Sequence, residues 1–153
     1  MELESGVTVR AGAREGTRPI LLATLGVPFD QAASAMAVDA AVEAGEPLIV
    51  ANVVELPPLA MSVKLGYDQL PYTPDEAEAL RAPAELAHSL GAEVERLRVR
   101  SPRPVEALLQ LVGERRPGLL VFGPDRTQLK PRTYRKAARA LRQRAACLVW
   151  LPD

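Results

Sequence analysis

The sequence is poor in the residues that most often perform chemistry. Of its 153 residues one is a cysteine, one is a histidine and 4% are aromatic, and 19 basic side chains balance 19 acidic ones. A single cysteine excludes an internal disulfide and suits a reducing compartment. A single histidine excludes a metal site built on two histidines and leaves no second one for a catalytic triad. Zero net charge gives no overall attraction to nucleic acid or to a membrane surface.

Long apolar runs are also missing. No run approaches the roughly 18–20 residues of a transmembrane helix, so no membrane partner is expected. The acidic N-terminus, Met1–Glu4, lacks the apolar segment of a secretory signal, and we expect a cytoplasmic location. The hydrophobic content of 48% is enough for the core of one domain. Residues 1–18 are polar and without periodicity, which predicts a flexible arm before a domain at 19–153.

Short apolar runs alternate with helical patterns along the rest of the chain. The runs, which suit buried strands, are residues 19–24, 48–54, 94–99, 119–123 and 147–151. Apolar residues at helical spacing separate each run from the next. This order predicts the α/β class, with a five-stranded, mainly parallel, doubly wound sheet covered by helices on both faces.

Several residues mark where the helices begin and end. Asp30 suits the N-cap of the first helix and Gly45 its stop. The segment Thr73–Glu76 has the form of a capping box, with Glu76 reaching back to the Thr73 backbone. Pro83 falls inside the helix that follows and costs it one hydrogen bond, which predicts a kink or a break.

The final third of the chain is strongly basic. Residues 125–144 hold eight bases against the single acid Asp125, a local charge of +7. The commonest reason for such a pattern is a solvated helix face; the alternatives are an anionic small ligand or a protein or nucleic-acid partner. Nucleic acid is not expected, because the aromatic side chains that stack on single-stranded bases are absent apart from Tyr134.

Four segments resemble the universal stress protein family over residues 19–152. The stretch Ile20–Pro28 is similar to the family's opening Ile-Leu-Val-Ala-Thr-Asp-Gly-Ser, and Ala145–Pro152 to its closing Ala-Pro-Cys-Pro-Val-Leu-Val-Val. The runs ending at Val53–Val54 and at Gly123 stand where the family has strands. The resemblance implies a Rossmann-like fold of the adenine nucleotide alpha hydrolase type.

One branch of that family binds ATP through a glycine motif, which this chain departs from. The motif is a glycine, two residues, a glycine, nine residues, then a glycine followed by Ser or Thr. Gly123 matches the first position, but Arg126 takes the second and Lys136-Ala137 the last pair. Leu25 replaces the acidic residue that ends the first strand. Large side chains at glycine positions obstruct the approach of backbone N–H groups to phosphate, which predicts a degenerate site.

The resemblance implies a candidate nucleotide or anion cleft at the ends of the strands, where open α/β sheets bind ligands. Its candidate residues are Thr24, Gly26, Val53, Gly123, Arg126, Lys130, Arg132 and Lys136. The leading hypothesis is a stress-associated regulatory or binding protein without the glycine-type ATP site, with no catalytic residues and no metal. The alternative is a module for ATP, another adenine nucleotide or another anion, in which the basic side chains replace backbone donors.

A protein-interaction or dimerisation module is the further alternative. The family resemblance and the apolar last strand together predict a homodimer through Cys147–Leu151, because an uncovered apolar edge strand associates. An enzyme is not expected. Weak nucleotide hydrolysis and a redox or hydrolytic enzyme centred on Cys147 are the two enzymatic alternatives, against an inert, buried cysteine.

Overall fold

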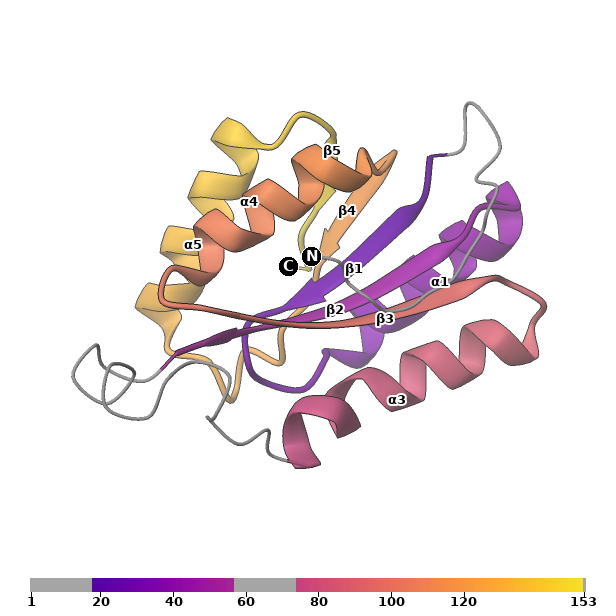
Figure 1. Ribbon diagram of the computed structural model, residues 1–153, viewed down its shortest axis with the longest axis horizontal. Coiled ribbons are helices and arrows are strands. Elements are labelled where there is room, and N and C mark those ends of the chain that lie inside the picture. The colour runs from indigo at the N-terminus through magenta and orange to yellow at the C-terminus, as the bar shows by residue number, and fades with distance from the viewer. Residues whose placement is uncertain (1–17, 57–73, 153) are drawn as a thin grey trace.

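The computed structural model describes residues 18–56 and 74–152, which form one α/β domain (Figure 1). The strands are β1 (Ile20–Thr24), β2 (Leu48–Glu55), β3 (Val94–Ser101), β4 (Leu119–Phe122) and β5 (Leu148–Trp150). The helices are α1 (Gln31–Ala44), α3 (Pro74–Ser89), α4 (Pro104–Arg115) and α5 (Pro131–Arg144). The alternation of strands and helices predicted from the sequence is confirmed. The predicted arm and the residues between 56 and 74 lie outside the described part.

The sheet is parallel throughout, in the order β3-β2-β1-β4-β5. In the centre of the sheet Leu22 of β1 stands between Val50 of β2 and Val121 of β4. The chain runs outward from β1 to β3 and then returns to the other side of β1 to build β4 and β5. The point where the direction of winding changes therefore lies between β1 and β4.

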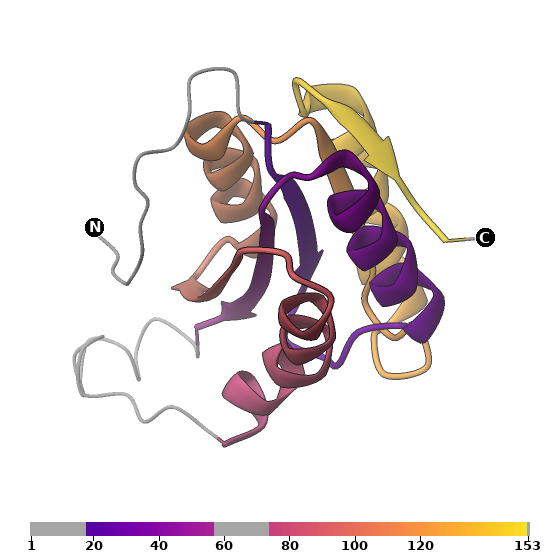
Figure 2. The ribbon, with the colours of Figure 1, turned by 90° about the vertical axis from the view of Figure 1, so that its right-hand side faces the viewer.

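Two separate cores lie on the two faces of the sheet. Side chains alternate between the faces, so that Leu21 and Ala23 contact the core beneath α4 and α5, whereas Ile20 and Leu22 contact the core beneath α1 and α3. Figure 2 shows the helices on either side of the strands. Burial of β1 on both faces explains why its sequence is a continuous apolar run rather than an alternating one.

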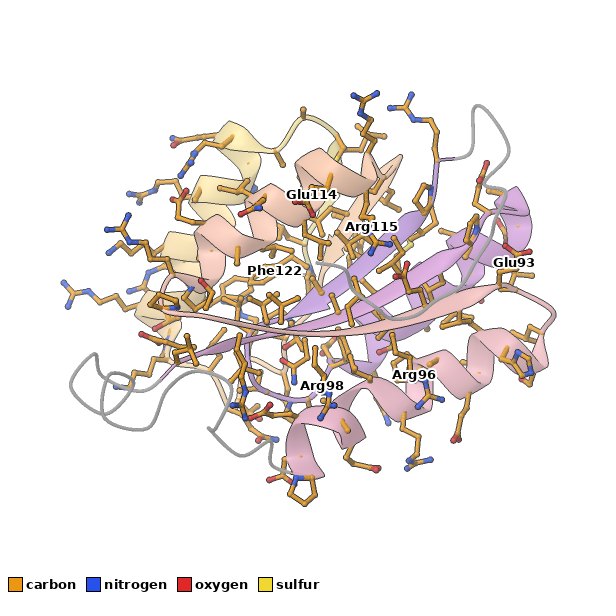
Figure 3. All side chains as sticks on the ribbon, viewed as in Figure 1. Glu93, Arg96, Arg98, Glu114, Arg115 and Phe122 are labelled. Carbon is orange, nitrogen blue, oxygen red and sulfur yellow. The ribbon has the colours of Figure 1, made fainter. Side chains whose placement is uncertain are left out.

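The edge strand β3 shows the same alternation with charged side chains. Arg96 and Arg98 extend toward α3, whereas Glu95, on the opposite face, pairs with Arg115 of α4 (Figure 3). A strand that is paired on one side only tolerates this many charges, because its side chains reach solvent. This composition explains why β3 reads as more polar than the other strands.

The predicted helix signals of α1 are confirmed. The Asp30 carboxylate accepts a hydrogen bond from the Ala33 N–H at 2.9 Å, and Gly45 ends the helix in the left-handed conformation, with φ 67°.

The break predicted at Pro83 is wrong, because α3 continues through it to Ser89. Pro83 is buried and lies on the wall of the groove between α3 and α1, and we infer that this burial offsets the hydrogen bond that the Ala79 carbonyl loses. The capping box falls on Thr73, outside the described residues. The Glu76 carboxylate pairs with the Arg100 guanidinium at 3.2 Å, with both side chains largely buried.

Candidate functional site

The candidate site lies where the chain leaves β1 and β4. These strands are neighbours, but β1 is followed by α1 on one face of the sheet and β4 by α5 on the other. Such a divergence leaves a crevice at the carboxyl ends of the strands in most doubly wound proteins. Gly26 lies in the loop after β1 and Gly123 directly after β4.

In this chain the two loops are hydrogen-bonded to each other across the crevice. The Asp30 N–H donates to the Gly123 carbonyl at 2.9 Å, and the Asp125 N–H donates to the Pro28 carbonyl at 2.8 Å. Phe29 and Pro124 form an isolated antiparallel bridge between these two bonds. A phosphate-binding loop offers free N–H groups to its ligand. Here the Asp30 and Asp125 N–H groups are already paired, and Pro124 has none.

Gly123, the one residue that matches the glycine motif, has a packing role in this structure. Its N–H donates to the Ala23 carbonyl at 2.9 Å, so its donor is also occupied. A Cβ atom at this position would lie 2.3 Å from the Cβ of Ala33 on α1. Only glycine permits α1 to approach the end of β4 this closely. The presence of Gly123 is thus explained without a phosphate.

The loop between Gly123 and α5 folds around a carboxylate. Asp125 accepts hydrogen bonds from the Thr127 N–H at 3.0 Å, the Thr127 hydroxyl at 2.7 Å and the Gln128 amide at 3.2 Å. These bonds, that of the Thr127 hydroxyl foremost, hold the pKa of the Asp125 carboxyl below its usual range. Asp125 therefore stays ionised at neutral pH and places a negative charge where the loop would have to accept a phosphate.

The four basic candidates gather around the start of α5. The Arg126 guanidinium lies over the Tyr134 ring, 4.0 Å from its centroid, and Tyr134 in turn stacks on Phe122. Lys130 is the N-cap of α5, which no side chain caps. Arg132 lies in the first turn and Lys136 in the second, and all four are exposed. The four cations thus lie on the loop before α5 and on its first two turns, with their side chains exposed.

The helix start also revises how the motif maps onto the structure. Lys136 and Ala137 lie in the second turn of α5, and Ala137 is buried in the core. The hydroxyl of the first turn belongs to Thr133, which the spacing of the motif does not select. Pro131 is the sequence signal that could have located this helix start, because proline is favoured at the first helical position.

Of the remaining candidates, Thr24 and Val53 are buried and Gly26 is exposed. Thr24 is fully buried and its hydroxyl donates to the Val27 carbonyl at 2.8 Å, which closes the turn after β1. Val53 is buried in the core beneath α4 and α5. Gly26 adopts the left-handed conformation, with φ 76°, and is exposed. Of these three, only Gly26 presents itself to a ligand.

Sequence reasoning missed Asn52, which organises this end of the sheet. Its side chain is 1% exposed. The amide oxygen accepts from the Gly26 N–H at 2.8 Å, and the amide nitrogen donates to the Glu76 carbonyl at 3.2 Å. Asn52 therefore joins the loop after β1 to the first turn of α3. A lone asparagine inside the apolar run of β2 is the signal that could have identified it.

An open groove of about 760 Å³ lies beside the crevice, between α1 and α3. Gly26 and Gln128 are at its wall, together with apolar residues such as Ala35, Ala82 and Pro83. The acids Asp75 and Glu78 also line it, whereas Arg126, Lys130, Arg132 and Lys136 do not. The cations therefore do not line the hollow, although Gln128 of their loop does, and the acidic wall of the hollow disfavours a phosphate group.

Cys147 is a free, partly buried cysteine in the segment before β5. Burial raises the pKa of the Cys147 thiol, so little of the reactive thiolate forms at neutral pH. Within residues 18–56 and 74–152, no three metal-ligating side chains converge. No helix in that part of the chain has the length and apolar content to cross a membrane.

The sheet order, the two helical layers and the switch point define a Rossmann-like, doubly wound α/β protein. Residues 16–151 match the model of the universal stress protein family, and the chain belongs to that family. A comparison with curated protein sequences gave no significant match.

Three solved structures illustrate the fold. A universal stress protein in complex with cAMP is 20% identical, with a TM-score of 0.62, over 91% of this chain and 99% of that one. The protein from Archaeoglobus fulgidus in complex with dAMP is 19% identical, with a TM-score of 0.62, over 89% and 98%. A family member from Arabidopsis thaliana with AMP bound is 14% identical, with a TM-score of 0.54, over 88% and 93%. At these identities the likeness establishes the fold.

Proposed function

We propose that this chain is a stress-associated binding and regulatory protein of the universal stress protein type that lacks the glycine-type ATP site. The single observation that carries the proposal is the pairing of the two loops across the crevice, through Asp30 with Gly123 and Asp125 with Pro28. A triphosphate held in the family's manner needs free backbone donors there, and opening the loops to provide them would break both hydrogen bonds. We further propose that the protein is not an enzyme and is cytoplasmic.

A thermal-shift titration with ATP, ADP, AMP and cAMP, with and without magnesium and with sulfate as the anion control, tests this proposal. Because binding to the native state stabilises it by mass action, a ligand at 100 times its Kd would add about 2.7 kcal/mol. We expect millimolar nucleotide to raise the melting temperature no more than sulfate does. A saturable rise for a nucleotide alone would contradict the proposal.

The second candidate function is binding of an adenine nucleotide at the start of α5. It is favoured by the uncapped helix terminus, whose first turn is free of acids, and by Arg126, Lys130 and Arg132 beside it. The solved relatives with cAMP, dAMP and AMP make an adenine nucleotide the natural choice of ligand. Under this candidate, the variant Arg126→Ala with Lys130→Ala loses a nucleotide-specific thermal shift that the parent shows. An unchanged shift in that variant would place the ligand elsewhere.

We also propose that the protein is a homodimer through β5. Within the described residues this strand pairs with β4 on one side only, and Leu148 is 74% exposed on it. An apolar edge of this kind is an association surface. We expect Leu148→Glu to reduce the mass measured by light scattering at micromolar concentration from dimer to monomer. Leu90→Glu, at another exposed leucine, is the matched control and should leave a dimer. A monomeric parent protein would refute the proposal.

A further inference from the structure

The two helical layers of this neutral protein carry opposite charges. Within their bounds, α1 and α3 hold six carboxylates and one arginine, a net charge of −5. Helices α4 and α5 hold seven basic residues and two carboxylates, a net charge of +5. Because each pair covers its own face of the sheet, the helices are acidic on one face and basic on the other, although Arg96 and Arg98 of β3 reduce the excess of negative charge on the α3 side. Such a separation orients a molecule toward a charged partner.

The positive charge is concentrated in one stripe along α5, defined by Arg132, Arg135, Lys136, Arg139 and Arg142. At about 100° per residue these five side chains fall within an arc of roughly 120°, and they span about 15 Å along the helix. All five are exposed, and α5 contains no acid. Figure 3 shows long nitrogen-tipped side chains extending outward from this helix.

The stripe has little internal neutralisation. Glu106 of the neighbouring α4 pairs with Arg144, at 2.6 and 2.9 Å, and Arg144 lies outside the stripe. Within the described residues, none of the five stripe side chains pairs with a carboxylate. The exposed face of α3 differs, because Arg81 there pairs with Glu78 and Glu85 on the same helix.

We propose that the stripe binds the phosphate backbone of a double-stranded nucleic acid, without reading its bases. The charge matches, because a duplex carries a regular row of phosphates along the 15 Å or so that the stripe covers. Exposed arginine and lysine side chains on a straight helix suit contacts to phosphate, which position a protein but carry no sequence information. The stripe shares Arg132 and Lys136 with the candidate cleft, but Arg135, Arg139 and Arg142 lie outside it.

The other classes of anionic partner fit the stripe less well. The apolar face of α5, formed by Tyr134, Ala137, Ala138 and Leu141, is buried in the core. The helix therefore has no free apolar side to insert into a lipid surface. The stripe has no exposed apolar or aromatic anchor of the kind that dominates protein interfaces. It also lacks stacking rings for single-stranded bases.

This proposal differs from the prediction, drawn from the sequence, that nucleic acid is not a partner. That expectation used the zero net charge and the lack of interleaved aromatic residues. The net charge averages over two faces that a duplex would not contact at the same time. The aromatic criterion applies to single strands, not to a duplex backbone.

Fluorescence anisotropy with a labelled duplex of about 20 base pairs, titrated between about 20 and 200 mM salt, tests the proposal. With three to five phosphate contacts, we expect log K to fall with log salt with a slope of about −2.7 to −4.5. The variant Arg135→Gln with Arg139→Gln should weaken binding about tenfold or more at low salt and reduce the slope by about two. Neither residue belongs to the candidate nucleotide cleft, so the two proposals fail independently.

The matched control is Arg81→Gln with Arg96→Gln, which removes the same charge from the side of the sheet that carries α3, and it should bind as the parent does. Two duplexes of unrelated sequence should bind equally. Absence of binding at the lowest salt, or binding that the stripe variant leaves unchanged, would overturn the proposal. So would equal competition by poly-glutamate of the same total charge, because the surface would then be a general polyanion site.

Discussion

Replacing Gly123 with alanine should destabilise the protein by about 3 kcal/mol or more, although the change adds a single methyl group. The new Cβ would stand 2.3 Å from the Cβ of Ala33. Both atoms are fixed to the backbone, one after β4 and one in the first turns of α1, so neither can rotate away. Relief requires α1 to move off the sheet, which would also lengthen the hydrogen bond from Asp30 to the Gly123 carbonyl. Urea denaturation of parent and variant measures the loss.

A second substitution on the facing helix provides the control. Ala33→Gly removes the opposing methyl group and by itself should cost about 1 kcal/mol through helix propensity. In the double variant Gly123→Ala with Ala33→Gly the contact disappears, so the stability should recover most of what Gly123→Ala lost. If Gly123→Ala is as stable as the parent, or if the double variant merely sums the two losses, the close approach is not what requires glycine.

Asn52→Ala should cost about 2–4 kcal/mol of unfolding free energy. The substitution removes two hydrogen bonds, and it leaves the Gly26 N–H and the Glu76 carbonyl without their partner. Because the side chain is almost fully buried, water cannot replace the amide without opening the structure. The loss should extend to the loop after β1 and the first turn of α3, which Asn52 joins.

Gln110→Ala is the matched control for this prediction. The Gln110 side-chain amide also donates a hydrogen bond, to the Glu114 carboxylate at 3.1 Å, but this bond lies on the exposed surface of α4. Its removal should change stability by less than about 0.5 kcal/mol. Equal losses of unfolding free energy in the two variants would mean that burial does not strengthen the contribution of the Asn52 hydrogen bonds.

The fold could be predicted from the sequence because its signals are local. The strands β1, β2 and β4 are buried on both faces, so each reads as a continuous apolar run, and Asp30 and Gly45 mark the ends of α1. Pro83 was misleading for a tertiary reason. The break it favours locally is overridden by the packing of its buried ring within α3.

The site was harder to predict because its decisive contacts join residues far apart in the chain. No local pattern around Gly123 predicts that its carbonyl accepts a hydrogen bond from the Asp30 N–H. Nor does the sequence indicate that the absence of a side chain at Gly123 leaves room for Ala33. The helical pattern of the sequence places Lys136 and Ala137 on the last helix, and they lie in the second turn of α5, where the last pair of the glycine motif falls. The stacking of Arg126 on Tyr134 likewise depends on where the helix begins.

Closure of the crevice is tested most directly by native-state amide hydrogen exchange, followed residue by residue by NMR, with and without millimolar ATP. If the loops are paired as the structure has them, the amides of Asp30, Gly123 and Asp125 exchange slowly, and ATP changes neither their exchange nor their chemical shifts. Rapid exchange at Asp30 and Asp125 in the free protein would contradict the closed crevice. Faster exchange of these amides when ATP is added would show that the loops open to admit a nucleotide. The crevice would then bind ATP despite the missing glycines.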